Sequence, residues 1–331
     1  MREAISLSVV VPAFNEEQVL PEFHRRLSAV LDTMPVTAEI VYVNDGSSDR
    51  TLAVMARLRE QDPRVAVVDL SRNFGKEIAL TAGLDHARGD AVAVIDADLQ
   101  DPPEMIPELF RGWVEGYDVV YGKRTSRAGE SIVKKSTAYL FYRIIQRLSR
   151  VRLPEDTGDF RLLSRRAVDA LGRLREQHRF MKGLFAWIGF RQKAVPYERA
   201  PRAGGKTKFN YWRLWNFALE GITSFTTAPL RVATYLGLVT AGGAFAYGGF
   251  IVADTLMFGN PVAGYPSLLT VVLFLGGVQL VTIGIIGEYL GRMFDESKQR
   301  PLYFLNAYEP ARPARSERPA VEAETLRSVA A

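Results

Sequence analysis

The sequence has no cysteine among its 331 residues and only three histidines, His24, His86 and His178. Without cysteine, disulfide bonds, thiol nucleophiles and cysteine-bound metals are excluded, and the chain suits a reducing compartment. The histidines do not show the spacing of metal ligands. We therefore expect them to be structural or surface residues.

Charge is also missing from two long stretches, although 24% of all residues are charged. Residues 232–253 and 255–287 contain no Asp, Glu, Lys or Arg. At ~1.5 Å per residue, a helix over the first stretch is roughly 33 Å long and can cross a hydrocarbon core of about 30 Å. Turn-forming residues begin the second stretch, so its span is expected at 266–287. The pattern favours a two-helix membrane hairpin over a pair of buried core helices.

The basic residues that flank these stretches predict the orientation of the chain. Arg231 precedes the first span, and Arg292, Lys298 and Arg300 follow the second, whereas the connecting loop has no Lys or Arg. By the positive-inside rule, the N-terminal domain and both termini lie in the cytoplasm. No signal peptide is predicted, because the first apolar run is short and has no basic leader.

Two further segments are predicted to lie on the membrane surface. Residues 131–151 set basic side chains against an apolar face, which is typical of a helix at an anionic membrane. Residues 209–230 are rich in aromatic side chains, with Trp212 and Trp215 suited to the headgroup level. Ordinary amphipathic helices packed on a core are the alternative for both. From residue 309 the chain is rich in Pro, Ala and charge, which predicts a disordered tail.

In the N-terminal part, apolar runs alternate with helical stretches. The runs LSVVVPAF, AEIVYVND, VAVVDLS and AVAVIDAD are separated by helical patterns. This order predicts an α/β fold with a mainly parallel sheet that helices cover on both faces. Ligands of such sheets bind beyond the carboxyl ends of the strands, an edge that we call the rim. Polar residues follow all four strands there: Asn15 and Glu16, residues 44–47, residues 71–73, and Asp96 with Asp98.

The rim is not a dinucleotide site of the usual kind, because the first strand is followed by PAFNEE rather than G-x-G-x-x-G. Asp96 and Asp98 do not begin an EF-hand either, because Asp101 stands where that loop requires glycine. Desolvating two like charges is costly unless a cation lies between them. An Asp-x-Asp pair at a strand end therefore predicts an open site for Mg²⁺ or Mn²⁺, which take a few carboxylates and leave other positions for water and substrate phosphates. A solvated turn is the alternative.

Five motifs occur in order along the chain: VVVPAFNEE, VNDGSSD, SRNFGKE, DADLQDPPE and TGDFRLL. In this order and spacing, they resemble the family 2 glycosyltransferases of the GT-A fold. More narrowly, the chain resembles the polyprenyl-phosphate hexosyltransferases, which include bactoprenol glucosyltransferases, aminoarabinose transferases and dolichyl-phosphate mannose synthases. The resemblance covers residues 5–305. It is highly specific for the family and less specific for the sugar.

The resemblance implies a metal-dependent, inverting transfer of a hexose from a nucleotide sugar to polyprenyl phosphate at the bacterial inner membrane. UDP-glucose and undecaprenyl phosphate are the expected substrates. The residues implied for the nucleotide pocket are Pro12, Ala13, Asn15, Glu16, Asp45, Lys76 and Asp96. The implied ligands of Mg²⁺ or Mn²⁺ are Asp96, Asp98 and Gln100, and the implied catalytic residues are Asp98 and Asp159. The cations available for donor or acceptor phosphates are Arg124, Lys134, Lys135, Arg202, Lys206 and Lys208.

Two of these roles have structural alternatives. Asp45 could instead form a turn before Gly46, and Asp159 could cap a helix that follows Phe160. The family would place a base at Asp159 for a hydroxyl acceptor. A phosphate acceptor is already mostly ionised in the cytoplasm, because its second pKa is about 6. We therefore expect Asp159 to orient the acceptor, the sugar or the metal shell rather than to remove a proton.

The sequence divides into a cytoplasmic catalytic domain over residues 1–208, an interfacial helix at 209–230, membrane helices within 231–290, a cytoplasmic segment at 291–308 and a tail at 309–331. GDP-mannose and aminoarabinose-type transfer are alternatives that differ only in pocket details. A processive polysaccharide synthase is disfavoured because the QxxRW motif is missing. A noncatalytic membrane scaffold is disfavoured because the acidic set is intact. We expect a homo-oligomer and no nucleic-acid partner.

Overall fold

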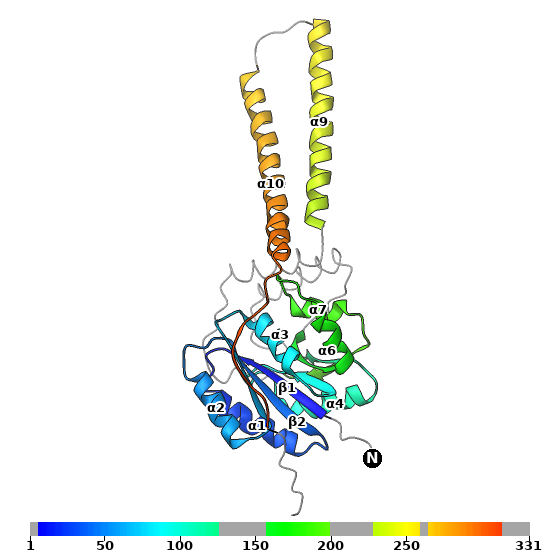
Figure 1. Ribbon diagram of the computed structural model, residues 1–331. Helices are drawn as coiled ribbons and strands as arrows, with labels where there is room; N and C mark the ends of the chain where they lie inside the picture. The colour runs from blue at the N-terminus through cyan, green and yellow to red at the C-terminus, as the bar shows by residue number, and fades with distance from the viewer. Residues whose placement is uncertain (1–5, 126–156, 199–227, 259–263, 313–331) are drawn as a thin grey trace, which may run out of the picture.

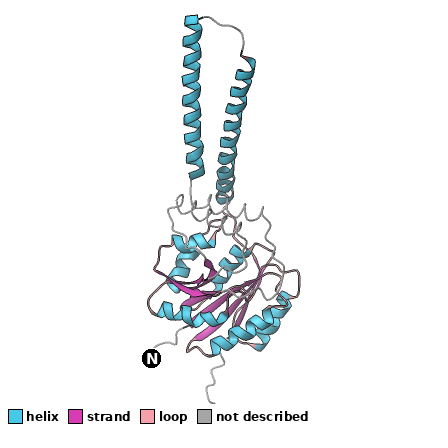
Figure 2. Ribbon diagram, turned by 180° about the vertical axis from the view of Figure 1, so that it is seen from behind, coloured by secondary structure: helices cyan, strands magenta, loops and turns pink. Residues whose placement is uncertain are grey.

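One eight-stranded mixed sheet forms the centre of the N-terminal domain (Figures 1 and 2). The computed structural model describes residues 6–125, 157–198, 228–258 and 264–312. The strands are β1 (Ser6–Ala13), β2 (Thr37–Asn44), β3 (Val65–Leu70), β4 (Ala91–Val94), β5 (Val119–Arg124), β6 (Thr157–Ser164), β7 (Gln192–Tyr197) and β8 (Leu305–Glu309). They lie in the order β7-β5-β6-β4-β1-β2-β3-β8.

The pairing of the strands is parallel at the centre of the sheet. β1 pairs in parallel with β2 and β4, β2 with β3, and β5 with β7. The antiparallel strands are β6, between β4 and β5, and β8, at the edge beside β3. The predicted α/β fold with a mainly parallel sheet flanked by helices is confirmed.

Helices cover both faces of this sheet (Figure 1). They are α1 (Leu20–Asp32), α2 (Thr51–Gln61), α3 (Lys76–His86), the 3₁₀ helix η1 (Pro103–Met105), α4 (Ile106–Val114), α6 (Arg165–Gly172) and α7 (Met181–Trp187). Successive side chains of a strand point to opposite faces. Val9 and Val11 accordingly pack in one core with α1, α2 and α4, whereas Val10 packs in the other with α3, α6 and α7. Both faces are therefore dry, which explains the uninterrupted apolar runs of the central strands.

Two long apolar helices extend side by side away from the sheet (Figures 1 and 2). They are α9 (Ala228–Phe258) and α10 (Tyr265–Ser297). By length and composition, Pro229–Phe258 and Phe274–Ser297 are apolar enough to cross a membrane. The helices contain the spans expected at 232–253 and 266–287 and extend beyond both. At the end of α10 the extension is polar, and Arg292 Nε donates to Glu288 Oε1 one turn away at 3.1 Å.

The chain after α10 returns to the sheet, which the sequence analysis did not predict. We call residues 298–312 the strap. Its strand β8 pairs antiparallel with β3, and Ser71 N donates to Phe304 O at 2.9 Å. Tyr303 OH donates to Asp85 Oδ2 at 2.9 Å. β8 includes Glu309, where the disordered tail was expected to begin. Its five residues, LNAYE, are too few to give a clear strand pattern, and it is held by backbone pairing with β3.

The predicted interfacial segment at 131–151 lies outside the described residues, as does the one at 209–230 up to residue 227. Residues 228–230 of the second segment belong to α9. Their helical structure and contact with a membrane surface stay predictions.

Gly83 allows α3 to pack closely on the sheet, and a larger residue should disturb that packing. A Cβ at this position would lie 2.3 Å from Val10 Cγ1 and 3.0 Å from Val43 Cγ2. We expect Gly83→Ala to lower the free energy of unfolding by about 1–3 kcal/mol. Gly172→Ala is the matched control, because nothing lies within 4 Å of its added Cβ. Thermal unfolding in detergent should show a clear loss for Gly83→Ala alone, and equal melting temperatures would contradict the packing argument.

Candidate active site

The rim begins with two loops that hold each other in place. Asn15, after β1, donates its backbone N–H to Ser47 Oγ at 3.0 Å and accepts from Ser48 N at 2.8 Å. Glu16 N donates to Thr51 Oγ1 at 2.8 Å. Asn15 has φ 57°, a left-handed conformation that asparagine tolerates better than most residues. The loops after β1 and β2 therefore form one rigid wall of the rim.

Pro12 and Ala13 lie at the start of this wall. Both are buried residues of β1, and Ala13 pairs in register with Asn44 of β2. The predicted contact of Pro12, Ala13, Asn15 and Glu16 with a nucleotide stays a prediction.

Asp45 anchors the loop that follows β3. Its Oδ1 accepts from Phe74 N at 2.7 Å and its Oδ2 from Gly75 N at 3.0 Å. Burial raises the pKa of Asp45, although these two N–H groups favour its charged form. Gly46 has φ 62°, and a Cβ there would lie 2.4 Å from Arg72 C. Asp45 is therefore built into the loop structure, and its contact with a nucleotide base stays a prediction.

Acidic side chains gather just beyond β4. Asp98 is buried, and its Oδ1 accepts from Gln100 N at 3.1 Å. Between them, Leu99 has φ 58°, which is rare for a branched residue and is a form of strain that clusters at functional sites. Among the described residues, no three Asp, Glu or His side chains lie close enough to hold a metal by themselves. Mg²⁺ needs only one or two carboxylates when water and phosphates complete its shell, so Asp96 and Asp98 suit such an ion.

Lys76 connects two of the predicted acids. Its Nζ lies 2.7 Å from Asp96 Oδ2 and 2.6 Å from Asp159 Oδ2. Lys76 is the first residue of α3, Asp96 follows β4, and Asp159 lies in β6. Three residues that are far apart in the sequence thus meet at the rim. Asp159 does not cap a helix, because it lies within a strand and Ser164 caps α6 instead.

Further cations surround Asp159. Burial alone would raise its pKa, but Lys76, Lys182 and Arg161 outweigh burial and hold the pKa well below its usual range. Arg161 donates to Gly158 O at 2.8 Å and stacks on Phe185, with Cζ 3.7 Å from the ring centroid. Burial lowers the pKa of Lys182, which lies on α7. These cations therefore favour the ionised form of Asp159. Its Oδ1 is buried and has no hydrogen-bond partner among the described residues.

Arg124 lies on the other side of this cluster, at the end of β5. Its Nε donates to Tyr197 OH at 3.4 Å, and Tyr197 in turn donates to Asp101. A Cβ on Gly158 would lie 2.8 Å from Arg124 Nη2, so glycine makes room for the guanidinium. Of the six predicted phosphate-binding cations, Arg124 lies within the described residues. The other five, Lys134, Lys135, Arg202, Lys206 and Lys208, lie outside them.

Five residues of the site were not predicted from the sequence: Glu77, Asp101, Arg161, Lys182 and Tyr197. Arg161 belongs to the motif TGDFRLL, two residues after Asp159. Glu77 follows Lys76 in the motif SRNFGKE, and Asp101 belongs to DADLQDPPE, so both stood beside predicted residues. Lys182 and Tyr197 belong to no motif, and only the folding of α7 and β7 against β6 and β5 brings them near the rim.

The rim faces the end of the domain from which α10 extends. Gln177 N donates to Glu296 Oε1 near the end of α10 at 2.7 Å. The contact between Ser71 and Phe304 joins the strap to the loop after β3. The loop that follows β3 at the rim is therefore joined to the strap that follows α10, and Figure 1 shows α10 extending away from the domain above α3.

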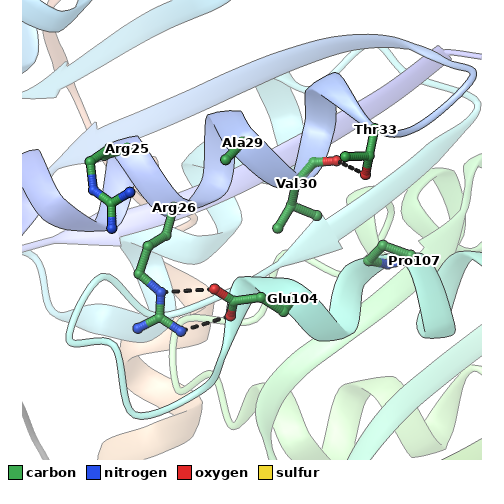
Figure 3. Close-up of a pocket in the computed structure, with 7 residues that line it drawn as sticks. All are labelled: Arg25, Arg26, Ala29, Val30, Thr33, Glu104 and Pro107. Carbon is green, nitrogen blue, oxygen red and sulfur yellow. Dashed lines mark hydrogen bonds and ion pairs between the residues drawn. The ribbon is translucent and has the colours of Figure 1, made fainter.

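A separate surface hollow of about 450 Å³ lies along α1 (Figure 3). Arg26 and Glu104 pair across it at 2.7 Å, and Arg25, Ala29 and Pro107 also line it. None of the predicted site residues lines this hollow.

Comparison with known proteins gives matches over most of the chain. The family model described as glycosyl transferase family 2 matches residues 8–172, and the model described as GtrB C-terminal hairpin matches residues 228–293. A bactoprenol glucosyl transferase of Shigella phage SfV is 50% identical over 301 residues, which cover 91% of this chain and 98% of that protein. An uncharacterized glycosyltransferase of Synechocystis sp. is 53% identical over 302 residues, which cover 91% of this chain and 95% of that protein.

The two backbone contacts of Asp45 predict a loss of stability on Asp45→Asn. An amide has one acceptor oxygen, so its NH₂ group would face one of the two N–H donors, at a cost of about 1–3 kcal/mol. We expect a lower melting temperature without any nucleotide, whereas the exposed control Asp32→Asn should melt close to the wild type. An unchanged melting temperature for Asp45→Asn would contradict the anchoring role.

Glu77 should make stability depend on pH. Burial, followed by the charge of Asp159, raises its pKa from 4.5 to about 7. A raised pKa in the folded state means that the folded protein binds the proton more tightly than the unfolded chain. The contribution of Glu77 is therefore fully present below pH 4.5 and is lost as the pH rises through about 7. Relative to Glu77→Gln, which imitates the protonated group, the wild type should lose melting temperature over this interval. Parallel pH profiles for the two proteins would contradict this result, and the exposed Glu108→Gln serves as the control.

Proposed function

The chain belongs to glycosyl transferase family 2, and from this membership we propose that it transfers glucose from UDP-glucose to undecaprenyl phosphate at the cytoplasmic face of the bacterial inner membrane. The glycosyltransferase activity itself follows from the family. The bactoprenol glucosyl transferases among its relatives, at about half identity over nearly their whole length, support the sugar and the lipid.

The observation that carries this proposal is the contact of Lys76 with both Asp96 and Asp159 at one edge of the sheet. The strap that follows α10 contacts the loop that leads to Lys76. A transfer between a soluble nucleotide sugar and a lipid phosphate requires charged groups of both signs near a bilayer. Acids can bind a divalent cation with the donor diphosphate, and cations can bind the acceptor phosphate.

Each residue of the site can be given a role in a single displacement. Asp96, Asp98 and Gln100 would hold Mg²⁺ or Mn²⁺, which supplies Lewis-acid stabilisation of the leaving diphosphate when bound. Lys76 would bind the donor phosphates, and Arg124 the acceptor phosphate. The acceptor oxygen attacks the anomeric carbon from the face opposite the leaving group, so the configuration inverts. Lys134, Lys135, Arg202, Lys206 and Lys208 remain further candidates for phosphate binding.

Asp159 would orient reacting groups rather than act as a base. Its pKa is held well below the usual range by Lys76, Lys182 and Arg161, against the effect of burial. A proton acceptor works best when its pKa lies near the working pH. The attacking phosphate needs no such help, because its second pKa is about 6.

The two apolar helices would cross the membrane, with both chain termini in the cytoplasm. Exposed side chains such as Phe245, Leu256 and Phe274 suit lipid contact. The distribution of basic residues around the helices supports the orientation. Close packing with a second copy is open to α9, since nothing lies within 4 Å of an added Cβ on Gly242 or Gly243.

Purified protein with undecaprenyl phosphate, Mg²⁺ or Mn²⁺ and a panel of labelled sugar nucleotides tests this function. We expect a glucose-labelled lipid from UDP-glucose and none after chelation of the metal. Asp98→Asn should lower the rate at least ~100-fold, because one metal ligand loses its charge. Asp169→Asn is the control, since Asp169 lies exposed on α6, 3.8 Å from Arg165.

The panel also separates the related activities. Transfer from GDP-mannose or an aminoarabinose nucleotide in place of UDP-glucose would overturn the proposed donor. No labelled lipid from any donor with metal present would overturn the proposed reaction.

A further inference from the structure

Lys76 occupies a position that the proposed function gives to another cation. Its ammonium lies within hydrogen-bonding distance of Asp96, a proposed metal ligand, and of Asp159. We propose that Lys76 competes with the divalent cation for Asp96 and moves to the donor diphosphate as the metal binds, so that metal and nucleotide bind together. This inference rests on the proposed function and adds to it a coupling between two ligands.

The distances show why the two cations would compete for Oδ2 of Asp96. Lys76 Nζ lies 2.7 Å from Asp96 Oδ2, which is a full charge-assisted hydrogen bond. A bound Mg²⁺ would lie about 2.0–2.1 Å from its carboxylate oxygen. An ammonium and a divalent cation that share this oxygen would repel each other strongly over such a short distance. Lys76 must therefore leave Asp96 before the oxygen can serve as a ligand.

Lys76 is also the group that is free to move. Its side chain is 45% exposed, whereas that of Asp159 is 9% exposed and that of Asp96 is 21% exposed. It is the first residue of α3, directly after Gly75, which has φ 96° and no atom within 4 Å of an added Cβ. A lysine has a flexible four-carbon stem. The acids, in contrast, are held by two paired strands. Asp96 follows β4 and Asp159 lies in β6, and these strands pair with Val94 opposite Arg161.

After Lys76 leaves, Asp159 and Asp96 would each still have a positive charge nearby. Asp159 keeps the neighbouring charges of Lys182 and Arg161. Lys76 lies at the N-terminus of the eleven-residue helix α3, where N–H groups and the helix dipole favour an anion. A diphosphate at the rim would thus give Lys76 a new partner while the metal takes Asp96.

Coupling of this kind is reciprocal and can be measured by binding alone. Mn²⁺ binding to the full-length protein in detergent is measured by electron paramagnetic resonance, with and without UDP. We expect Lys76→Met to bind Mn²⁺ without nucleotide at least ~tenfold more tightly than the wild type, because the competing cation is gone. We expect UDP to tighten Mn²⁺ binding in the wild type at least ~fivefold more than in Lys76→Met.

Lys182→Met is the matched control. It removes one positive charge near Asp159, but the charge of Lys182 acts on Asp159 without an ion pair within 4 Å in the described structure. Its Mn²⁺ affinity should change much less than that of Lys76→Met. Lys76→Gln provides a second variant if Lys76→Met does not fold.

Three results would overturn the inference: no gain in Mn²⁺ affinity for either Lys76 variant, an equal gain for Lys182→Met, or an equal effect of UDP on wild type and variant. Failure here is distinct from failure of the proposed function. Metal-dependent transfer of glucose by the wild type, together with no gain for the variants, would reject the competition and keep the reaction.

Discussion

The balance of buried charges at the rim is the constraint on which the rest of the site depends. Burial would raise the pKa of Asp159, and Lys76, Lys182 and Arg161 around it lower that pKa and favour the charged form. Those cations come from α3, α7 and β6, which are joined through the sheet rather than through the sequence. Each of them contributes to the positive surroundings of this carboxylate, and two remain if one is removed. The site is therefore a property of the assembled fold, and the helices on one face of the sheet serve both its stability and its chemistry.

The antiparallel strand β6 makes this arrangement possible. It lies between β4 and β5 and runs opposite to β4, so its first residues lie at the edge where β4 ends. Asp159 thereby comes beside Asp96, although more than sixty residues separate them in the chain. A purely parallel sheet would place the end of every strand, not its beginning, at the rim. The parallel strand β4 leads to Asp96 and Asp98, and the one reversed strand beside it adds Asp159 to the same edge.

The sequence predicted the parts of the protein that have a local signal. Continuous apolar runs predicted the central strands, the lack of charge predicted α9 and α10, and the motifs placed Asp96, Asp98 and Asp159 in one site. Three features had no local signal. β8 is a strand of only five residues that pairs by its backbone. Lys182 and Tyr197 reach the rim through tertiary contacts alone. The pairing of Asp45 with Phe74 and Gly75 depends on a loop that follows another strand. Residue patterns record periodicity and turns, but they do not record which distant backbone groups meet.

The strap adds a mechanical link between the apolar helices and the chemistry. It leaves α10, contacts the loop after β3 through Phe304 and continues as β8 along that same strand. This loop leads directly into α3, whose first residue is Lys76. Because the chain enters the sheet again after α10, this helix is joined to the domain through the backbone pairing of β8 with β3. The same strap contacts the loop that leads to Lys76, so the attachment of α10 and the position of Lys76 share one edge of the sheet.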